Sequence, residues 1–289
     1  MIDRNALPAH ASGEFAIGGD LPVFRLGYGA MQIPGAGVWA EPRDHDEVIR
    51  VLRRALELGV TFIDTADSYG PEVSERLIRE ALHPYPEGVV IATKAGLTRP
   101  GPDRWERNGK PEYLRSQAEK SLRLLGLERI ELFQLHRIDP DVPLADSLGA
   151  LLELQSEGKI GQIGLSQVSV AEIEAARAIT PIATVQNLYN LADRSSEPVL
   201  EYCQRKGIGF IPWFPMATGR LATAGGPLQQ IAEQHGATPA QLALAWLLQR
   251  SPLLLPIPGT SRVTHLEENL AAALIELTPD QIDQLGAAV

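Results

Sequence analysis

The chain has 289 residues, of which 44% are hydrophobic and 21% are charged, a composition that suits a folded core and excludes a disordered protein. Its 26 Lys and Arg against 36 Asp and Glu give a formal net charge of −10, which argues against a general nucleic-acid binder, because such a protein must neutralise phosphates. The single cysteine, Cys203, excludes an internal disulfide and a cysteine-based metal site. Residues 1–15 lack the apolar run of a signal peptide, and no run approaches the roughly 18 apolar residues of a membrane span. We therefore expect a cytoplasmic protein.

Eight short apolar runs alternate with helix-like segments from residue 23 onward. The runs span residues 23–28, 60–64, 89–94, 130–136, 160–166, 182–187, 208–214 and 253–259. Near-continuous hydrophobicity over runs this short is typical of parallel strands that are buried on both faces. Helix-start patterns lie between the runs, for example Asp44-x-x-Glu47, Ser169-x-x-Glu172 and Thr238-Pro239-x-Gln241.

Eight strand–helix units in a chain of this length predict an α/β fold, a closed (β/α)8 TIM barrel. An open doubly wound sheet ranks second, because it usually has fewer strands. Residues 15–23 predict a short N-terminal β-hairpin around Gly18-Gly19, placed to cover the bottom of the barrel. No linker, charge block or low-complexity segment divides the chain, so we expect residues 1–289 to form one domain.

The carboxyl ends of the predicted strands carry ionisable and polar side chains. Asp64 ends the second run and Tyr69 follows it, Lys94 ends the third run, and His136 ends the fourth. Later runs end in Ser166 and Gln167, in Gln186, and in Trp213. A TIM barrel gathers these ends on one face, which is where its active site lies.

The four ionisable groups suit the donation of a proton to a carbonyl oxygen. A phenol has a pKa of about 10, and a nearby ammonium lowers that pKa by attracting the phenolate. We therefore expect Lys94, held by Asp64, to lower the pKa of Tyr69, and His136 to orient the carbonyl group or to share the proton. The set contains no electron source, so a reduction requires a hydride from a cofactor.

Six segments, in order along almost the whole chain, resemble the aldo-keto reductase superfamily. They are TFIDTADSYG, IATKAG, LFQLHRID, IGQIGLSQVSVAEI, VQNLYN and PIPGTSRVTHLEENL. The segments LGYGAMQIPG and FIPWFPMA further resemble bacterial members grouped with the pyridoxal reductases. The resemblance implies reduction of aldehydes and ketones, pyridoxal among them, with NADPH or, less favoured, NADH. It also implies that Tyr69 is the general acid and that Asp64, Lys94 and His136 complete the catalytic set.

The same resemblance implies which residues bind the cofactor. Ser166, Gln167 and Gln186 match positions that hold the nicotinamide carboxamide, and Trp213 matches the aromatic residue that stacks on the ring. Gln167 stands where the family usually has Asn, and Trp213 where it usually has Tyr. The resemblance also implies cofactor contacts by Asp64 and, along the cofactor, by Gly29, Ala30 and Met31. At the 2′-phosphate it implies Gly259, Thr260, Ser261 and Arg262, and near the adenosine His265, Glu268 and Asn269.

The segment after the eighth run has the chemistry of a phosphate site. Backbone amides at a helix N-terminus favour a phosphate, and Arg262 adds a charged fork. His265 stands where many members of the family carry Arg or Lys, so a smaller preference for NADPH over NADH is implied. Gly27-Tyr28-Gly29 runs on to Gln32 and fails the Rossmann pattern G-x-G-x-x-G.

Two other functions stay open. A metal-dependent barrel hydrolase or isomerase has little support, because the 6 histidines form no H-x-H or H-E-x-x-H pair, and we expect no metal. A cofactor-binding barrel with vestigial activity, acting as a binding or regulatory module, would be distinguished by its lack of turnover. Trp105, in the 95–111 loop after the third run, is a candidate substrate contact. The expected partner is a small carbonyl compound, with no nucleic acid or membrane, and the sequence leaves monomer and homo-oligomer open.

Overall fold

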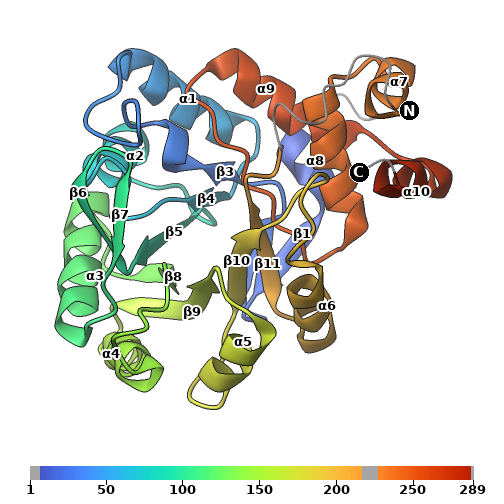
Figure 1. The fold of residues 1–289 in the computed structure, drawn as a ribbon. Coiled ribbons are helices and arrows are strands. Elements are labelled where there is room, and N and C mark those ends of the chain that lie inside the picture. The colour runs from blue at the N-terminus through green and yellow to red at the C-terminus, as the bar shows by residue number, and fades with distance from the viewer. Residues whose placement is uncertain (1–6, 217–226, 288–289) are drawn as a thin grey trace.

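A computed structural model of the protein describes residues 7–216 and 227–287, and a curved parallel sheet forms its centre (Figure 1). The strands of this sheet are β3 (Tyr28–Gly29), β4 (Phe62–Asp64), β5 (Val90–Ala95), β8 (Ile130–Leu135), β9 (Ile160–Ser166), β10 (Thr184–Leu188) and β11 (Gly209–Trp213). Each strand pairs in parallel with the next strand of this sheet along the chain, so all seven lie in sequence order. Their carboxyl ends therefore meet at one face, as the barrel prediction requires.

The eighth predicted run, residues 253–259, closes the ring without forming a regular strand. Phe210 of β11 makes two backbone hydrogen bonds to this run, and on its other side the Gly27 amide donates to the Pro256 carbonyl. Pro256 and Pro258 have no amide hydrogen, so a full ladder cannot form. The (β/α)8 prediction is confirmed as a closed barrel whose last segment is irregular.

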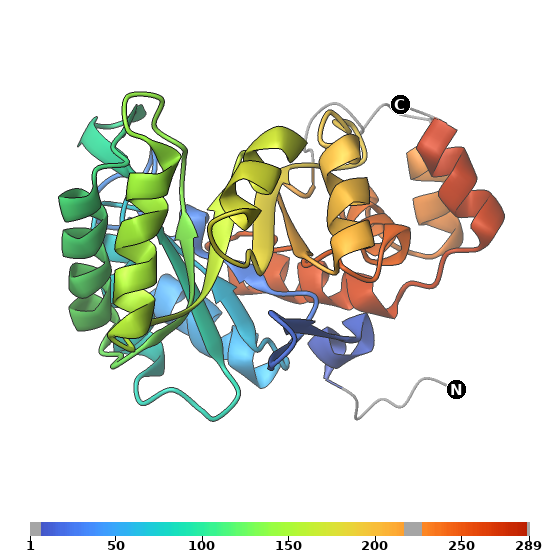
Figure 2. The same ribbon diagram turned by 90° about the horizontal axis from the view of Figure 1, so that it is seen from below.

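The N-terminal hairpin is also confirmed and lies against the bottom of the barrel (Figure 2). It consists of β1 (Glu14–Ile17) and β2 (Leu21–Phe24), and Gly18 and Gly19 take the positive φ angles, 67° and 94°, that its turn needs. Its buried side chains pack on Phe62, Leu132 and Ile211 inside the barrel. The predicted strand 23–28 was therefore wrong in extent, because apolar content does not say which neighbour a residue pairs with.

Helices cover the outside of the sheet. They are α1 (His45–Glu57), α2 (Val73–Leu82), α3 (Pro111–Leu125), α4 (Leu144–Ser156), α5 (Val170–Arg177), α6 (Glu197–Lys206), α7 (Pro227–Gln234), α8 (Pro239–Arg250), α9 (Val263–Ala271) and α10 (Pro279–Ala287), with short 3-10 turns at Pro8–Ser12, Ala30–Gln32 and Ala272–Leu274. The predicted caps form, with Asp44 accepting from the Glu47 amide and complete capping boxes at Ser169 and Thr238. Within the described residues, no helix has the length and apolar character needed to cross a membrane.

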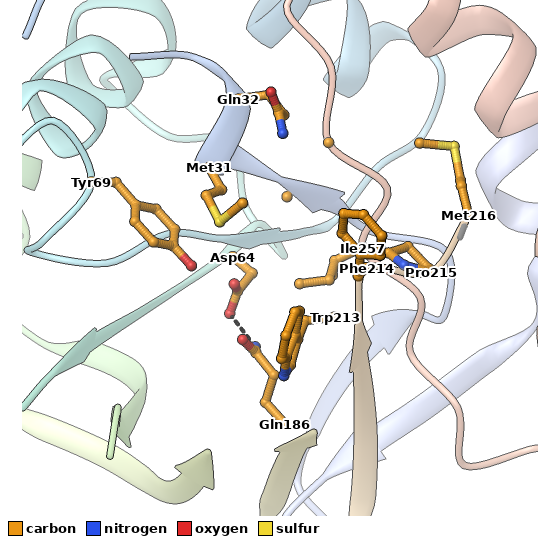
Figure 3. Close-up of a pocket in the computed structure, with 12 residues that line it drawn as sticks. Met31, Gln32, Asp64, Tyr69, Gln186, Trp213, Phe214, Pro215, Met216 and Ile257 are labelled. Atoms are coloured by element: carbon orange, nitrogen blue, oxygen red, sulfur yellow. Dashed lines mark hydrogen bonds between the residues drawn. The ribbon is translucent and has the colours of Figure 1, made fainter. Parts of the chain in front are cut away.

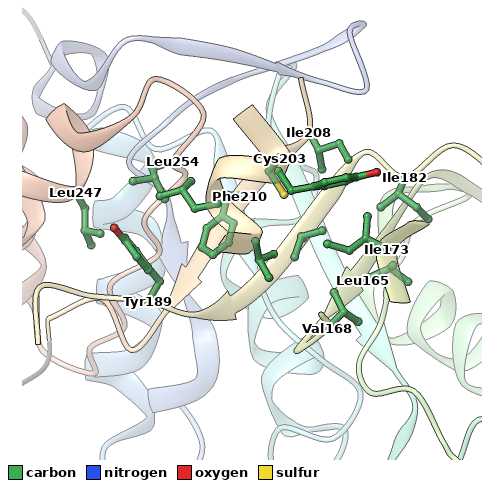
Figure 4. Packing of buried hydrophobic residues seen from close by; sticks show 14 of the residues in the cluster. Leu165, Val168, Ile173, Ile182, Tyr189, Cys203, Ile208, Phe210, Leu247 and Leu254 are labelled. Atoms are coloured by element: carbon green, nitrogen blue, oxygen red, sulfur yellow. The ribbon is translucent and has the colours of Figure 1, made fainter. Parts of the chain in front are cut away.

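The main core lies between the sheet and these helices (Figure 4). Leu165 and Phe210 from the strands pack there against Ile173 of α5 and Cys203 of α6. Burial raises the pKa of the Cys203 thiol to about 12, so the thiolate is not formed at neutral pH. Cys203 is therefore a packing residue, as expected for a small buried side chain.

A second hairpin projects over the carboxyl face of the barrel. It is made of β6 (Leu97–Gly101) and β7 (Arg104–Arg107), and it lies in the 95–111 loop between β5 and α3. The Arg99 guanidinium lies 3.6 Å above the Trp105 ring and donates hydrogen bonds to the carbonyls of Gly37, Val38 and Ser68. These contacts hold the hairpin against the loops that follow β3 and β4.

Candidate active site

The structure brings Asp64, Tyr69, Lys94 and His136 together at the carboxyl face. Asp64 ends β4, Lys94 lies near the end of β5, His136 follows β8, and Tyr69 lies in the loop after β4. The Lys94 Nζ lies 2.6 Å from Asp64 Oδ1 and 3.5 Å from the Tyr69 hydroxyl. The rings of Tyr69 and His136 are 6.0 Å apart between centroids. All four side chains are buried, so a small molecule that reaches them leaves most of its water behind.

The Asp64 carboxylate has a donor for each oxygen. Lys94 donates to Oδ1, and Gln134 Nε2 donates to Oδ2 at 3.0 Å. Gln186 Nε2 also donates to Oδ2, at 2.9 Å (Figure 3). A buried ion pair is tolerable only where such further hydrogen bonds satisfy its atoms. Gln134 was missed by the sequence analysis, although its position two residues before His136 on β8 places both side chains on the same face.

Burial and charge act in opposite directions on the Tyr69 phenol. Burial raises the pKa of Tyr69, and Lys94 lowers it without cancelling the effect of burial. The net direction is upward, opposite to the lowered pKa that we expected from the sequence, because strand spacing does not reveal the depth of a side chain. At neutral pH the phenol therefore holds its proton and is available as a donor.

Lys94 is charged at neutral pH, whereas His136 is neutral. Burial lowers the pKa of Lys94, but Asp64 and Tyr69 more than offset this, so the net pKa is raised and the ammonium stays charged. Burial, with Lys94 and Arg137 nearby, lowers the pKa of His136 well below its usual value, so the imidazole is neutral. A neutral imidazole has one N–H to donate, and Ser68 Oγ lies 3.3 Å from its Nδ1. His136 can thus hold a carbonyl oxygen while Tyr69 supplies the proton.

Two residues at later strand ends contact neighbours that the sequence did not indicate. Ser166 Oγ accepts a hydrogen bond of 3.0 Å from Arg137 Nη1, which leaves its own hydroxyl hydrogen free to donate. Gln167 Oε1 accepts a hydrogen bond of 2.9 Å from the Trp213 indole. Gln167 and Trp213, two of the positions at which the sequence departs from the family that it resembles, are therefore in direct contact.

Three cavities meet at Met31 on the carboxyl face. The first, of ≈ 130 Å³, is lined by Asp64, Tyr69, Gln186 and Trp213 (Figure 3). The second, of ≈ 570 Å³, extends past α1 to the start of α9. The third, of ≈ 470 Å³, lies beneath the β6–β7 hairpin. Together they form an elongated depression that runs from the start of α9 to Tyr69 and His136.

Two glycines allow the segments on one side of the first cavity to approach each other closely. A Cβ at Gly29 would lie 2.4 Å from the Ile257 carbonyl oxygen, and one at Gly259 would lie 2.7 Å from the Gly29 carbonyl oxygen. The two segments approach so closely that both positions require glycine. The neighbouring Ala30 is fully buried, whereas Met31 lines all three cavities.

The segment that leads into α9 lies at the far end of this depression. Ser261 and Arg262 line the second cavity, and Thr260 is buried with its carbonyl bound by the Tyr28 hydroxyl at 2.6 Å. One amide at the start of α9, that of Val263, is already bound to Glu47 Oε1 at 3.0 Å, so a carboxylate lies close to the predicted phosphate position.

The three α9 residues predicted near the adenosine have different surroundings. His265 and Glu268 are exposed, and the Glu268 carbonyl accepts a hydrogen bond from Gln241. Asn269 is buried, and its Nδ2 has no hydrogen-bond partner in the part of the chain that the structure describes. A buried amide donor without a partner is costly, and a bound ligand with an acceptor would remove that cost.

Trp105 of β7 lies where the sequence placed a candidate substrate contact. It lines the third cavity, and its ring meets Tyr69 and His136 edge-on at 6.4 and 6.5 Å between centroids. It is 37% exposed, so it forms an outer wall of the cavity. Among residues 7–216 and 227–287, no three His, Cys, Asp or Glu side chains are grouped as metal ligands would be.

Comparison with known proteins gives matches to oxidoreductases over nearly the whole length of this chain. Residues 25–289 match the model of the aldo/keto reductase family. The chain is 50% identical over 281 residues to an uncharacterized oxidoreductase of Schizosaccharomyces pombe, covering 97% of this chain and 91% of that protein. It is 42% identical over 281 residues to the pyridoxine 4-dehydrogenase of Escherichia coli, covering 95% and 98%. The structure of an aldo-keto reductase from Klebsiella pneumoniae in complex with NADPH matches with a TM-score of 0.80 at 28% identity, covering 94% of this chain and 93% of that one.

Proposed function

The chain belongs to the aldo/keto reductase family, and on that premise we propose that it reduces aldehydes or ketones to alcohols with NADPH, with Tyr69 donating the proton. The observation that carries this proposal is the buried Tyr69 hydroxyl, 3.5 Å from the Lys94 Nζ, in the wall of two adjoining cavities. The alternative, a barrel with vestigial activity, is less well supported because Tyr69, Lys94, Asp64 and His136 are all present and in contact or close proximity.

The residues around the first two cavities fit a dinucleotide. Trp213 in the wall of the first cavity offers its face to a flat ring, and the buried Asn269 amide has no partner among the described residues, which an acceptor on a base would supply. Arg262 supplies a positive charge for a phosphate, although the nearby Glu47 reduces it, which agrees with a limited preference for NADPH over NADH. When bound, NADPH supplies the hydride that this chain cannot supply itself.

The catalytic side chains have separate roles in this proposal. His136 donates its N–H to the substrate oxygen and orients it, and Tyr69 transfers its proton to that oxygen as the carbonyl carbon gains hydride. Lys94 then stabilises the phenolate by direct attraction, and Asp64 keeps the ammonium in place. Ser166 and Gln186 hold the cofactor amide, and Trp105 contacts the substrate from outside. We also propose that residues 1–289 form one domain.

The substrate proposal rests on the relative that is 42% identical, whose name is pyridoxine 4-dehydrogenase. We propose pyridoxal as a substrate on that basis. The test is the loss of NADPH absorbance with pyridoxal, an activated benzaldehyde, a short aliphatic aldehyde, a dicarbonyl compound and an aldose, with NADH run in parallel. Turnover of at least one compound is expected, and a preference for pyridoxal would establish the proposal that pyridoxal is a substrate. Saturable NADPH binding without any turnover would replace the proposal with the vestigial alternative.

A further inference from the structure

The cavity beneath the β6–β7 hairpin carries positive charge in a chain whose net charge is −10. Tyr69 and His136 line part of it, and Arg107 and Arg137 line another part. No Asp or Glu is among the described residues that line this cavity. Since His136 is neutral, the formal charge of the side chains that line this cavity comes from the two arginines alone.

Arg137 has no carboxylate partner among the described residues, although it is only partly exposed. Its Nη1 donates to the His136 carbonyl at 2.6 Å and to Ser166 Oγ at 3.0 Å, and both acceptors are uncharged. Burial lowers the pKa of Arg137; Tyr69 acts against this, and the nearby Arg107 adds to it, so the net direction is downward. Its charge is thus both partly desolvated and opposed by a second cation, which is unfavourable unless an anion is bound.

Arg107 at the end of β7 is exposed, and within the described residues it makes no ion pair or side-chain hydrogen bond. Several other described arginines are paired with carboxylates, for example Arg54 with Glu57 and Arg115 with Glu153. Its neighbour Arg104 on the same strand is paired with Glu106 and does not line the cavity. Arg107 and Arg137, neither of which has a carboxylate partner among the described residues, therefore lie together at the cavity that adjoins the proposed proton donor.

We propose that Arg107 and Arg137 form a subsite for an anionic group of the substrate, a carboxylate or a phosphate, and that the preferred substrates are aldehydes or ketones that carry one. This inference rests on the proposed reductase function. A guanidinium recognises either anion through paired N–H donors, and positive charge at the cavity rim also attracts anions from solution. The phosphates of the cofactor do not account for these arginines, because the cavity that Arg262 lines is a different one on the other side of Met31.

The test compares charged and neutral benzaldehydes. The 3- and 4-carboxybenzaldehydes, their methyl esters and 4-formylphenyl phosphate are reduced with NADPH at low and at high salt. The ester withdraws electrons more strongly than the carboxylate, so its carbonyl is intrinsically the more easily reduced, and any preference for the anion must come from the protein. We expect kcat/KM to be about tenfold or more higher for at least one carboxylate than for its ester at low salt, falling as salt screens the attraction.

Arg107→Gln should reduce that carboxylate-to-ester ratio by about tenfold, mainly through KM. Arg104→Gln is the matched control on the same strand and should leave the ratio unchanged. Preference for the phosphate over both carboxylates would assign the subsite to phosphate monoesters, and the reverse would assign it to carboxylates. A wild-type ratio of one or less for every pair, or a ratio that Arg107→Gln leaves intact, overturns the inference. Turnover of the esters in that case would leave the reductase function standing, whereas no turnover of any aldehyde would refute both.

Discussion

Replacing Lys94 with methionine tests the centre of the site, because this substitution removes the ammonium and keeps the length of the side chain. Lys94 and Asp64 are 0% and 2% exposed, so solvent screens their attraction little. Removing one member of a buried ion pair costs about 3–5 kcal/mol, because the other charge is left uncompensated. Gln134 and Gln186 still donate to Asp64 Oδ2, so we expect the lower end of that range, about 3 kcal/mol.

The measurement is the free energy of unfolding in urea for Lys94→Met and for Lys94→Met with Asp64→Asn. The second change neutralises the stranded carboxylate and keeps an oxygen for the two glutamine amides, so the double variant should regain at least about half of the lost stability. If Lys94→Met unfolds with the wild-type free energy, or if the double variant is no more stable than the single one, the buried charges do not interact as the structure indicates.

Carbonyl reduction should not recover with stability. Both variants lack the ammonium that opposes the effect of burial on the pKa of Tyr69, so reduction should fall by about 10²–10⁴-fold in each. Recovery of activity together with stability in the double variant would mean that Lys94 acts only by supporting the fold. An unchanged pH profile for reduction in Lys94→Met would show that Lys94 does not act on the pKa of Tyr69.

Two further predictions concern residues behind and beside the site. Glu75 is fully buried, and burial raises its pKa. The stabilising contribution of its protonated carboxyl group is therefore present at acid pH and is lost as pH rises through the folded-state pKa. Glu75→Gln keeps the acceptor for the Thr93 hydroxyl, so its melting temperature should exceed that of the wild type by more at pH 8 than at pH 5. The exposed Glu112→Gln is the control, and an equal difference at both pH values would contradict the assignment. Gln167→Met removes the acceptor for the Trp213 indole and should weaken NADPH binding by about two- to tenfold; unchanged affinity would mean that this hydrogen bond does not position the ring.

The order of strands and the position of the proposed catalytic side chains could be predicted because both follow from local patterns. Buried parallel strands read as short apolar runs, and the carboxyl ends of those strands meet wherever a barrel forms. Asp64, Lys94 and His136 were found in this way from their positions alone. The irregular closing segment was predicted as a strand because Pro256 and Pro258 interrupt the hydrogen bonding without changing the apolar pattern.

Contacts between distant parts of the chain could not be predicted in the same way. The hydrogen bond from Trp213 to Gln167 joins two strand ends, and no spacing in the sequence indicates it. Arg107 and Arg137 belong to different loops, and no spacing in the sequence indicates that they line one cavity. The direction of the Tyr69 pKa was also missed, because burial depends on side chains packed around it from several elements.

The most direct test of the proposed mechanism is the steady-state reduction of an accepted aldehyde by wild type and by Tyr69→Phe, with NADPH binding measured for both. The substitution keeps the ring and removes only the hydroxyl. The mechanism predicts that reduction falls by about 10²–10⁴-fold while the affinity for NADPH is retained, because only the proton donor is lost. Full activity in Tyr69→Phe would contradict it and would require another group to protonate the carbonyl oxygen.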